Sequence, residues 1–366
     1  MEQQFLEHTN CIVNLANSIL GEFGIERGEK LEILEKYLEQ SYENIVVILL
    51  DGMGKSIIEK NLEPDGFFNA HLAGTYSSVF PPTTVAATTS IVSGLYPCEH
   101  GWLGWDCYYP QIDKNVTVFL NKETGTDTLA AEYNVAWQYC GYESVAEKIR
   151  KRNGSAFEVT PFVEPFPNSF EKICEEIKCL CQQPGKKYIY GYWNEPDMTM
   201  HKKGCYGKAA KEILQTLEKQ VEQLCKELKN TLVIVTADHG HIDSRGVALT
   251  DYPNIMECLV RMPSIEPRAL NFFVKEEKRQ QFEREFEKEF GSKFLLLTKQ
   301  EVLEKKLFGT GEEHPQFREM LGDYLALATD DLSIYTTKEE AEFFVGVHAG
   351  ITKDEMVIPL IVIERK

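Results

Sequence analysis

The sequence predicts an α/β domain built on a mainly parallel β-sheet, and three observations support this. First, four short apolar runs occur at 45–50, 188–193, 232–235 and 358–363, and all but the aromatic run at 188–193 are rich in β-branched residues. Such runs are typical of strands that are buried on both faces of a parallel sheet. Second, an amphipathic helical segment from Ile213 to Leu228 separates the second and third runs. A strand, a helix and a strand in succession indicate a parallel pair with a right-handed crossover.

The third observation is that an acidic residue follows each of the first three runs. Asp51 comes directly after the first run, Asp197 lies just beyond the second, and Asp238 lies just beyond the third. Open α/β sheets bind their ligands at the carboxyl ends of the strands. We therefore expect these carboxylates at one edge of the sheet.

The remaining segments predict helices around the sheet and an inserted subdomain. The first forty residues favour helix, with Leu31, Ile33, Leu34 and Leu38 spaced among charged residues. Residues 256–340 have a different sequence pattern. It predicts a highly charged helix with phenylalanines on one face, at 282, 286 and 290, and a short strand at 294–297. We predict a catalytic core at 1–255 and 341–366 and an inserted α+β cap at 256–340. The insertion leaves after Asp238 and returns before His348, so we expect the cap beside the site.

Composition excludes several classes of protein. The 366 residues are 43% hydrophobic and 26% charged, which suits a globular chain with a large core and excludes disorder. A formal charge of −18 argues against a nucleic-acid polymer as partner. The sequence shows neither a secretory leader nor an apolar run of ~18 residues, so we expect a cytoplasmic protein without membrane contact. The ten cysteines are scattered without zinc-knuckle spacing, which predicts reduced thiols.

A threonine-rich segment carries a candidate nucleophile. Residues 80–94 read as a loop that enters a helix, with Thr83 or Thr84 near its N-terminus and Gly94 at its end. A hydroxyl at a helix N-terminus lies among free backbone N–H groups at the positive end of the helix dipole, which favours a bound phosphate or a developing alkoxide. From this segment alone, a helix-capping threonine is the more common explanation.

Paired aspartate and histidine residues suggest metal ligands. Asp197 and His201 are four residues apart, on one face of a helical turn. Asp238 and His239 are adjacent after the third strand, and His348 sits in a glycine-rich turn. Each pair alone is more often structural. Together with Asp51 they form a carboxylate and imidazole set without thiolate, which suits Zn²⁺ and tolerates Mn²⁺ or Fe²⁺.

These motifs resemble the alkaline phosphatase superfamily, in its type I phosphodiesterase/nucleotide pyrophosphatase branch. The matching segments are 50–52, 80–101, 197–201, 236–240 and His348, in the family's order and over most of the chain. The resemblance implies a doubly wound sheet with helices on both faces. It also implies two divalent metal ions, the first held by Asp51, Asp238, His239 and the oxygen of Thr84, the second by Asp197, His201 and His348. With Ser90 to Gly94 aligned, Thr84 rather than Thr83 matches the family nucleophile.

The chain also departs from the family pattern. Ala87 stands where nucleotide pyrophosphatases typically have an asparagine, and Trp105-Asp106 replaces a different pair in many relatives. Both changes question nucleotide specificity more than catalysis. We expect His100 to be structural and see no reason in the sequence to make His241 a ligand. The aromatic residues just after the candidate nucleophile helix are by default core residues, although they could wall a substrate pocket.

The resemblance implies a metal-dependent phosphoesterase that acts through a phosphothreonine on a small phosphorylated substrate. We favour diesters or pyrophosphate-type bonds, because monoesterases often clamp the second phosphate charge with an arginine. No arginine occurs between Arg27 and Arg150, so Lys55, Arg245 or Arg268 would have to serve. Phosphonate hydrolysis and phosphomonoester hydrolysis are the alternatives. A non-catalytic binding scaffold is disfavoured, because all seven candidate positions are filled.

Overall fold

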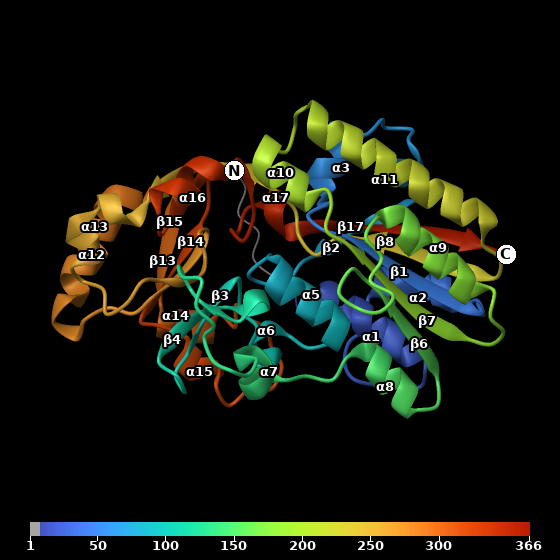
Figure 1. Cartoon of the computed structure of the whole chain (residues 1–366), viewed down its shortest axis with the longest axis horizontal. Coiled ribbons are helices and arrows are strands. Elements are labelled where there is room, and N and C mark those ends of the chain that lie inside the picture. Colours follow the sequence, from blue (N-terminus) through green and yellow to red (C-terminus); the bar gives the residue numbers. More distant parts are fainter. Residues whose placement is uncertain (1–7) are drawn as a thin grey trace.

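The computed structural model describes residues 8–366, which form two lobes (Figure 1). The larger lobe contains a six-stranded sheet in the order β2-β17-β8-β1-β7-β6. Its strands are β1 (Asn44–Leu50), β2 (Leu72–Ser77), β6 (Ser155–Val159), β7 (Lys187–Trp193), β8 (Thr231–Thr236) and β17 (Val357–Arg365). Strands β8, β1, β7 and β6 are parallel, whereas β17 is antiparallel to both of its neighbours. The predicted mainly parallel sheet is confirmed.

Helices cover both faces of this sheet. On one face lie α3 (Lys55–Asn61), α9 (Phe170–Cys181), α10 (Asp197–Lys203) and α11 (Lys208–Glu227), and on the other α1 (Ile12–Glu22), α5 (Thr84–Ser93) and α8 (Val145–Lys151) (Figure 1). The doubly wound arrangement is therefore as expected. The helix predicted for the first forty residues is two helices, α1 and α2 (Glu32–Leu38), with non-helical residues between them. Its residues 1–7 lie outside the described chain.

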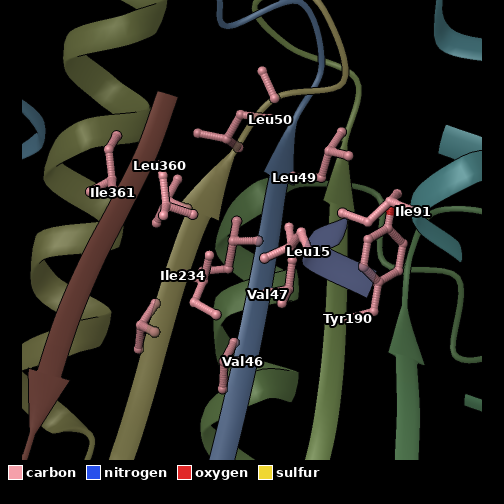
Figure 2. Packing of buried hydrophobic residues seen from close by; sticks show 14 of the residues in the cluster. Leu15, Val46, Val47, Leu49, Leu50, Ile91, Tyr190, Ile234, Leu360 and Ile361 are labelled. Carbon is pink, nitrogen blue, oxygen red and sulfur yellow. The ribbon is translucent and has the colours of Figure 1, made fainter. Parts of the chain in front are cut away.

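The core of the larger lobe is packed from both sides of β1. All seven residues of β1 are buried, as a central strand of a two-sided sheet requires. Figure 2 shows Val46 and Val47 of β1 between Ile234 of β8 and Tyr190 of β7, with Leu15 and Ile91 among the cluster side chains. Removing such a side chain typically costs about 2–5 kcal/mol of stability, because the cavity left behind is only partly refilled. This rigid sheet fixes the carboxyl ends of its strands.

The smaller lobe contains a seven-stranded antiparallel sheet in the order β13-β14-β12-β11-β3-β4-β5. Its strands are β3 (Asp106–Tyr109), β4 (Lys114–Thr117), β5 (Lys122–Glu123), β11 (Ser264–Glu266), β12 (Ala269–Phe272), β13 (Phe294–Thr298) and β14 (Tyr324–Ala328). The predicted phenylalanine stripe lies on α13 (Arg279–Phe290) and is buried. The other helices of this lobe include α6 (Pro97–His100), α7 (Val135–Cys140), α12 (Pro253–Met256), α14 (Lys299–Glu304), α15 (Phe317–Met320) and α16 (Lys338–Phe343).

The cap sheet is not made by residues 256–340 alone. Strands β3, β4 and β5 lie between Asp106 and Glu123, yet β3 pairs with β11 through Asp106 and Ile265. The domain boundaries drawn from sequence therefore miss one of the two segments that build this lobe. The three strands are only four, four and two residues long, too short to show a clear alternating pattern.

A buried ion pair joins the two lobes. Arg268, in the turn between β11 and β12, donates from Nε to Glu355 Oε1 at 2.6 Å and from a terminal nitrogen to Glu355 Oε2 at 2.8 Å. Glu355 belongs to α17 (Lys353–Met356), which leads into β17 of the core sheet. Both side chains are fully buried. Among residues 8–366, no helix combines the length and apolar character that crossing a bilayer requires.

Candidate metal centre

The register of the core sheet brings the predicted carboxylates to one edge. Leu50 of β1 lies opposite Trp193 of β7, and Leu49 lies opposite Thr236 of β8, so the three strands end at the same level. The backbone N–H of Asp51 then donates to the Trp193 carbonyl at 3.0 Å, and the N–H of Asp197 donates to the Asp51 carbonyl at 3.1 Å. Adjacent parallel strands thus place Asp51, Asp197 and Asp238 in one cluster.

The first predicted ligand group is assembled around His239. His239 Nε2 lies 3.3 Å from Asp51 Oδ1, 3.5 Å from Asp238 Oδ2 and 3.2 Å from Thr84 Oγ1. Asp238 Oδ1 accepts the N–H groups of Gly52 and His239, both at 3.0 Å. Asp238 Oδ2 is buried and has no hydrogen-bond partner in the described chain. A buried carboxylate oxygen that accepts no hydrogen bond and has only His239 Nε2 nearby fits a cation, because a buried charge without hydrogen bonds is otherwise costly.

The second group surrounds Asp197 Oδ1. His201 Nε2 lies 3.3 Å from this oxygen and His348 Nε2 lies 3.8 Å from it. The carbonyl of Gly346 contacts His201 Nδ1 at 2.8 Å, which turns the opposite ring nitrogen toward Asp197. His348 reaches the group because β16 (Gly346–Val347) pairs with β9 (Ile242–Asp243). The structure therefore brings together all seven residues expected to bind metal.

One member of this cluster, His241, was not predicted from the sequence. His241 Nε2 lies 2.6 Å from Asp197 Oδ1, and the ligand atoms of Asp197, His201, His241 and His348 all lie within 4.8 Å of one another. The His241 ring is fully buried, and its Nδ1 has no partner in the described chain. The available signal was the His239-x-His241 spacing, because side chains two residues apart in an extended segment point to the same side.

The electrostatics of the cluster call for added positive charge. Burial raises the pKa of Asp238, and the nearby Asp51 carboxylate raises it further. Burial lowers the pKa of His239, but the carboxylates of Asp238 and Asp51 outweigh this and raise it to about 10. Tyr192 donates its hydroxyl to Asp51 Oδ2 at 2.5 Å. Three carboxylates this close and this buried are expensive unless cations offset them.

Helix α5 separates the roles of its two N-terminal threonines. Thr83 is the N-cap residue, and its hydroxyl donates to Glu266 Oε1 at 2.5 Å instead of capping the helix. Thr84, the first helical residue, points its Oγ1 to the first ligand group, 3.4 Å from Asp51 Oδ1. Gly94 ends the helix at φ 70°, a left-handed conformation that favours glycine.

Residues elsewhere around α5 have structural surroundings. His100 is buried, with Nε2 3.0 Å from Ser90 Oγ, while its Nδ1 accepts the N–H of Trp102 at 3.0 Å. Burial lowers the pKa of His100 to about 3, so this ring is neutral. Ala87 is buried and offers no side-chain donor. All ten cysteines belong to the described residues, and none forms a disulfide.

A cavity of about 380 Å³ opens beside the two ligand groups. Thr84, Asp197, His201 and His348 form part of its wall. The rest comes largely from the cap, including Trp105, Asp106, residues 263–268 and residues 334–336. The cap therefore borders the cluster, as the chain order predicted, and the Trp105-Asp106 pair faces the same space.

Comparison with known proteins places this arrangement in a family. The model of the family described as type I phosphodiesterase / nucleotide pyrophosphatase matches residues 45–350, a span that contains all seven candidate positions. The chain belongs to this family. It is a hydrolase that acts on phosphoric ester bonds. No curated protein sequence matches the chain.

Solved structures share the fold at low sequence identity. Murine ectonucleotide pyrophosphatase/phosphodiesterase 5, solved as an inactive variant in complex with AMP, is 18% identical, with a TM-score of 0.65 over 88% of this chain and 87% of that one. The human protein is 16% identical with a TM-score of 0.66 over the same shares. Phosphonoacetate hydrolase from Sinorhizobium meliloti 1021, in complex with phosphonoformate, is 14% identical with a TM-score of 0.62, over 88% and 90% of the chains.

Proposed function

We propose that the chain is a metal-dependent phosphodiesterase that uses Thr84 as its nucleophile. The observation that carries the proposal is the placement of Thr84 Oγ1 within 3.2–3.4 Å of His239 Nε2 and Asp51 Oδ1, at the edge of a buried carboxylate cluster. A free threonine hydroxyl is a weak nucleophile and needs activation. Its position at the start of α5 and beside this cluster supplies both the helix dipole and a route to activation.

The donor set fits two divalent metal ions. Asp51, Thr84, Asp238 and His239 would hold one, and Asp197, His201 and His348 the other, with His241 beside the second. The Asp238 Oδ2 atom without a hydrogen bond, and the gathering of the ligand atoms of Asp197, His201, His241 and His348 within 4.8 Å of one another, support this fit. Carboxylates and imidazoles without thiolate suit Zn²⁺ best and also accept Mn²⁺ or Fe²⁺. When bound, such ions supply the positive charge that favours an alkoxide at Thr84 and stabilises the leaving oxygen.

The protein groups outline a two-step displacement. Thr84 Oγ1 attacks phosphorus, the bond from phosphorus to the leaving oxygen breaks, and a phosphothreonine forms. Water then breaks the bond between phosphorus and Thr84 Oγ1, so that a diester and water give a monoester and an alcohol. Backbone N–H groups at the start of α5 can hold the phosphoryl oxygens through both steps.

The charges around the cavity favour a diester over a monoester. Arg268 lines the cavity, but Glu355 and the carbonyls of Asp330 and Leu332 occupy its guanidinium. Lys55 is paired with Glu59, and neither Lys55 nor Arg245 belongs to the cavity wall. A second phosphate charge would therefore find no arginine clamp among the cavity residues.

A substrate panel tests the proposal. The purified chain, loaded with Zn²⁺ or Mn²⁺, is assayed with bis(p-nitrophenyl) phosphate, p-nitrophenyl phosphate, p-nitrophenyl sulfate and phosphonoacetate. We expect the diester to give the highest kcat/KM. A clear preference for the monoester or for phosphonoacetate would replace the diester assignment with one of the two alternatives. Absence of turnover on every substrate would favour a binding scaffold.

A further inference from the structure

The cavity beside Thr84 contains a pair of carboxylates that the proposed mechanism does not use. We propose that Glu266 and Asp106 bind a primary ammonium group on the organic part of the substrate. The proposed substrate class is an aminoalkyl phosphodiester, and the inference rests on the phosphodiesterase function proposed above. The Trp105-Asp106 pair, which departs from the pattern of many relatives, thereby gains a role in specificity.

Glu266 presents one carboxylate oxygen to the cavity. Its Oε1 accepts two hydrogen bonds, from Thr83 Oγ1 at 2.5 Å and from the N–H of Trp105 at 2.8 Å. Its Oε2 has no hydrogen bond or ion pair within residues 8–366. The side chain lines the cavity although the residue is only 9% exposed. A buried carboxylate with one saturated and one open oxygen is poised to accept a donor from a ligand.

Asp106 repeats this arrangement on the neighbouring strand. The pairing of β3 with β11 sets Asp106 opposite Ile265, next to Glu266. Asp106 Oδ1 accepts the hydroxyls of Thr117 at 2.6 Å and Thr124 at 2.7 Å, which leaves Oδ2 without a partner in the described chain. Burial raises the pKa of Glu266 to about 7, with a contribution from the charge of Asp106. The two carboxylates thus repel each other, and a cation between them would relieve that repulsion.

The rest of the cavity supplies little positive charge. Arg268 is held by Glu355, and Lys202 is exposed at the rim. Glu340 adds a third, exposed carboxylate. The wall is otherwise largely apolar and aromatic, with Trp105, Ile334, Tyr335, Phe343 and Phe344. Aromatic faces also attract ammonium groups, whereas a carboxylate or a second phosphate in this space would be repelled.

A primary ammonium fits better than a quaternary one or a neutral diol. It offers three N–H donors, which can meet the open oxygens of Glu266 and Asp106 together. A quaternary ammonium has no donor, and a diol brings no charge to offset the carboxylates. At about 380 Å³, the cavity lies within the usual range of small-ligand sites and can hold an aminoalkyl group.

Three chromogenic diesters that share one leaving group test the inference. The 2-aminoethyl, ethyl and 2-carboxyethyl esters of p-nitrophenyl phosphate differ mainly in the charge of the second ester group. At pH 8, with Zn²⁺ or Mn²⁺ bound, we expect kcat/KM to be about tenfold or more higher for the aminoethyl ester than for the ethyl ester, as a charge-assisted contact predicts. The carboxyethyl ester should react more slowly than both.

Matched variants assign the preference to the pair. Glu266→Gln and Asp106→Asn keep side-chain shape but remove charge, and each should lower the aminoethyl-to-ethyl ratio toward one. Glu339→Gln, which removes an exposed carboxylate that is not part of the cavity wall, should keep the ratio. Ethyl ester turnover without amine preference, or an equal loss of preference in Glu339→Gln, would overturn this inference alone. No turnover of any of the three esters would overturn the phosphodiesterase proposal, and this inference with it.

Discussion

His241 Nε2 lies 2.6 Å from Asp197 Oδ1, and this contact puts an eighth polar side chain in a cluster for which the family pattern supplies seven. Asp197 also faces His201 and His348. Burial opposes ionisation of Asp197, but the three imidazoles outweigh it and lower the pKa of the carboxyl. The Asp197 carboxylate is therefore held ionised and oriented, whether His241 contacts a metal ion directly or acts through Asp197.

Replacing His241 should weaken the binding of one of the two proposed metal ions. Loss of a partner of a ligating carboxylate typically reduces metal affinity by about 10- to 100-fold. We expect the affinity of one ion to be about tenfold or more lower in His241→Ala than in the wild-type chain, while the affinity of the other ion is unchanged. Titration calorimetry measures both affinities. His71→Ala, at the end of α4 (Phe67–Ala70) and outside the cluster, is the control. Unchanged affinity for both ions in His241→Ala would show that the contact has no part in binding.

The number of metal ions that the chain binds should depend on Asp238. Elemental analysis of the purified chain should find two divalent ions, and Asp238→Ala should lose one of them, because the open Oδ2 disappears. Saturating metal should also raise the free energy of unfolding, since ions that bind only the folded chain stabilise it. Asp65→Ala removes an exposed carboxylate and is the control. Full activity after chelator treatment with no residual metal would contradict the two-ion proposal.

Thr84→Ala should abolish turnover while metal binding survives. The variant loses the attacking oxygen but keeps Asp51, Asp238 and His239, so kcat should fall by a factor of about 10³ or more. Mass spectrometry should trap phosphate on Thr84 in the wild-type chain. The matched control is Thr83→Ala, which loses the hydrogen bond to Glu266 at a cost of about 1–2 kcal/mol in stability. Phosphate mapped to another residue would reassign the nucleophile.

The raised pKa of Glu266 predicts that the stability of the chain depends on pH. Burial raises the pKa of Glu266 from 4.5 to about 7 in the folded chain. Between these values the unfolded chain has released its proton while the folded chain still holds one, so stability falls as pH rises from about 4.5 through 7. Between pH 5 and pH 8 the free energy of unfolding of the wild-type chain should fall by about 2–3 kcal/mol more than that of Glu266→Gln. Urea unfolding in the presence of a chelator measures both. Parallel pH profiles for the two chains would contradict the raised pKa.

The pair of Arg268 and Glu355 should behave as one unit. Arg268→Met leaves Glu355 buried without its guanidinium, which should cost about 3–5 kcal/mol. Glu355 also accepts the N–H of Gly350 and the hydroxyl of Thr352, both in the loop that follows His348. The double variant Arg268→Met/Glu355→Gln should be more stable than the single one, because no buried charge remains. Additive losses in urea unfolding would show that the two side chains act independently.

The sequence predicted four of the six strands of the core sheet, because those four are marked by apolar runs, whereas β2 and β6 were not predicted. The run 45–50 is almost purely apolar and β-branched, and it lies within β1 with all seven of that strand's residues buried. The seven site residues could be named because Asp51, Asp197 and Asp238 each follow such a strand. His201 and His239 are paired with two of these aspartates, and His348 lies in a glycine-rich turn. The family resemblance selected Thr84 over Thr83 and implied how the ligands divide between two ions. Their metal-binding and catalytic roles stay predictions.

The features that the sequence did not predict depend on contacts between residues that are far apart along the chain. Strand β17, which lies between β2 and β8, is apolar like β8, and its antiparallel direction follows only from how the chain returns to β8. The place of Glu266 beside Thr83 depends on a pairing between residues 106 and 265. His241 looked ordinary because its partner, Asp197, lies 44 residues earlier. Local patterns do not identify which distant residue such a side chain contacts.

The composite cap sheet constrains how this protein can be shortened or recombined. Strands β3 to β5 leave the core before β6, β7 and β8 have appeared in the chain, and their partner β11 follows all three. Excising residues 256–340 would not give a smaller enzyme with an open site. It would leave β3–β5 as a three-stranded ribbon whose edge strand has lost its partner β11. Such an unpaired edge can pair with other chains and lead to aggregation. Swapping caps between relatives would therefore require exchanging two separate pieces of sequence at once.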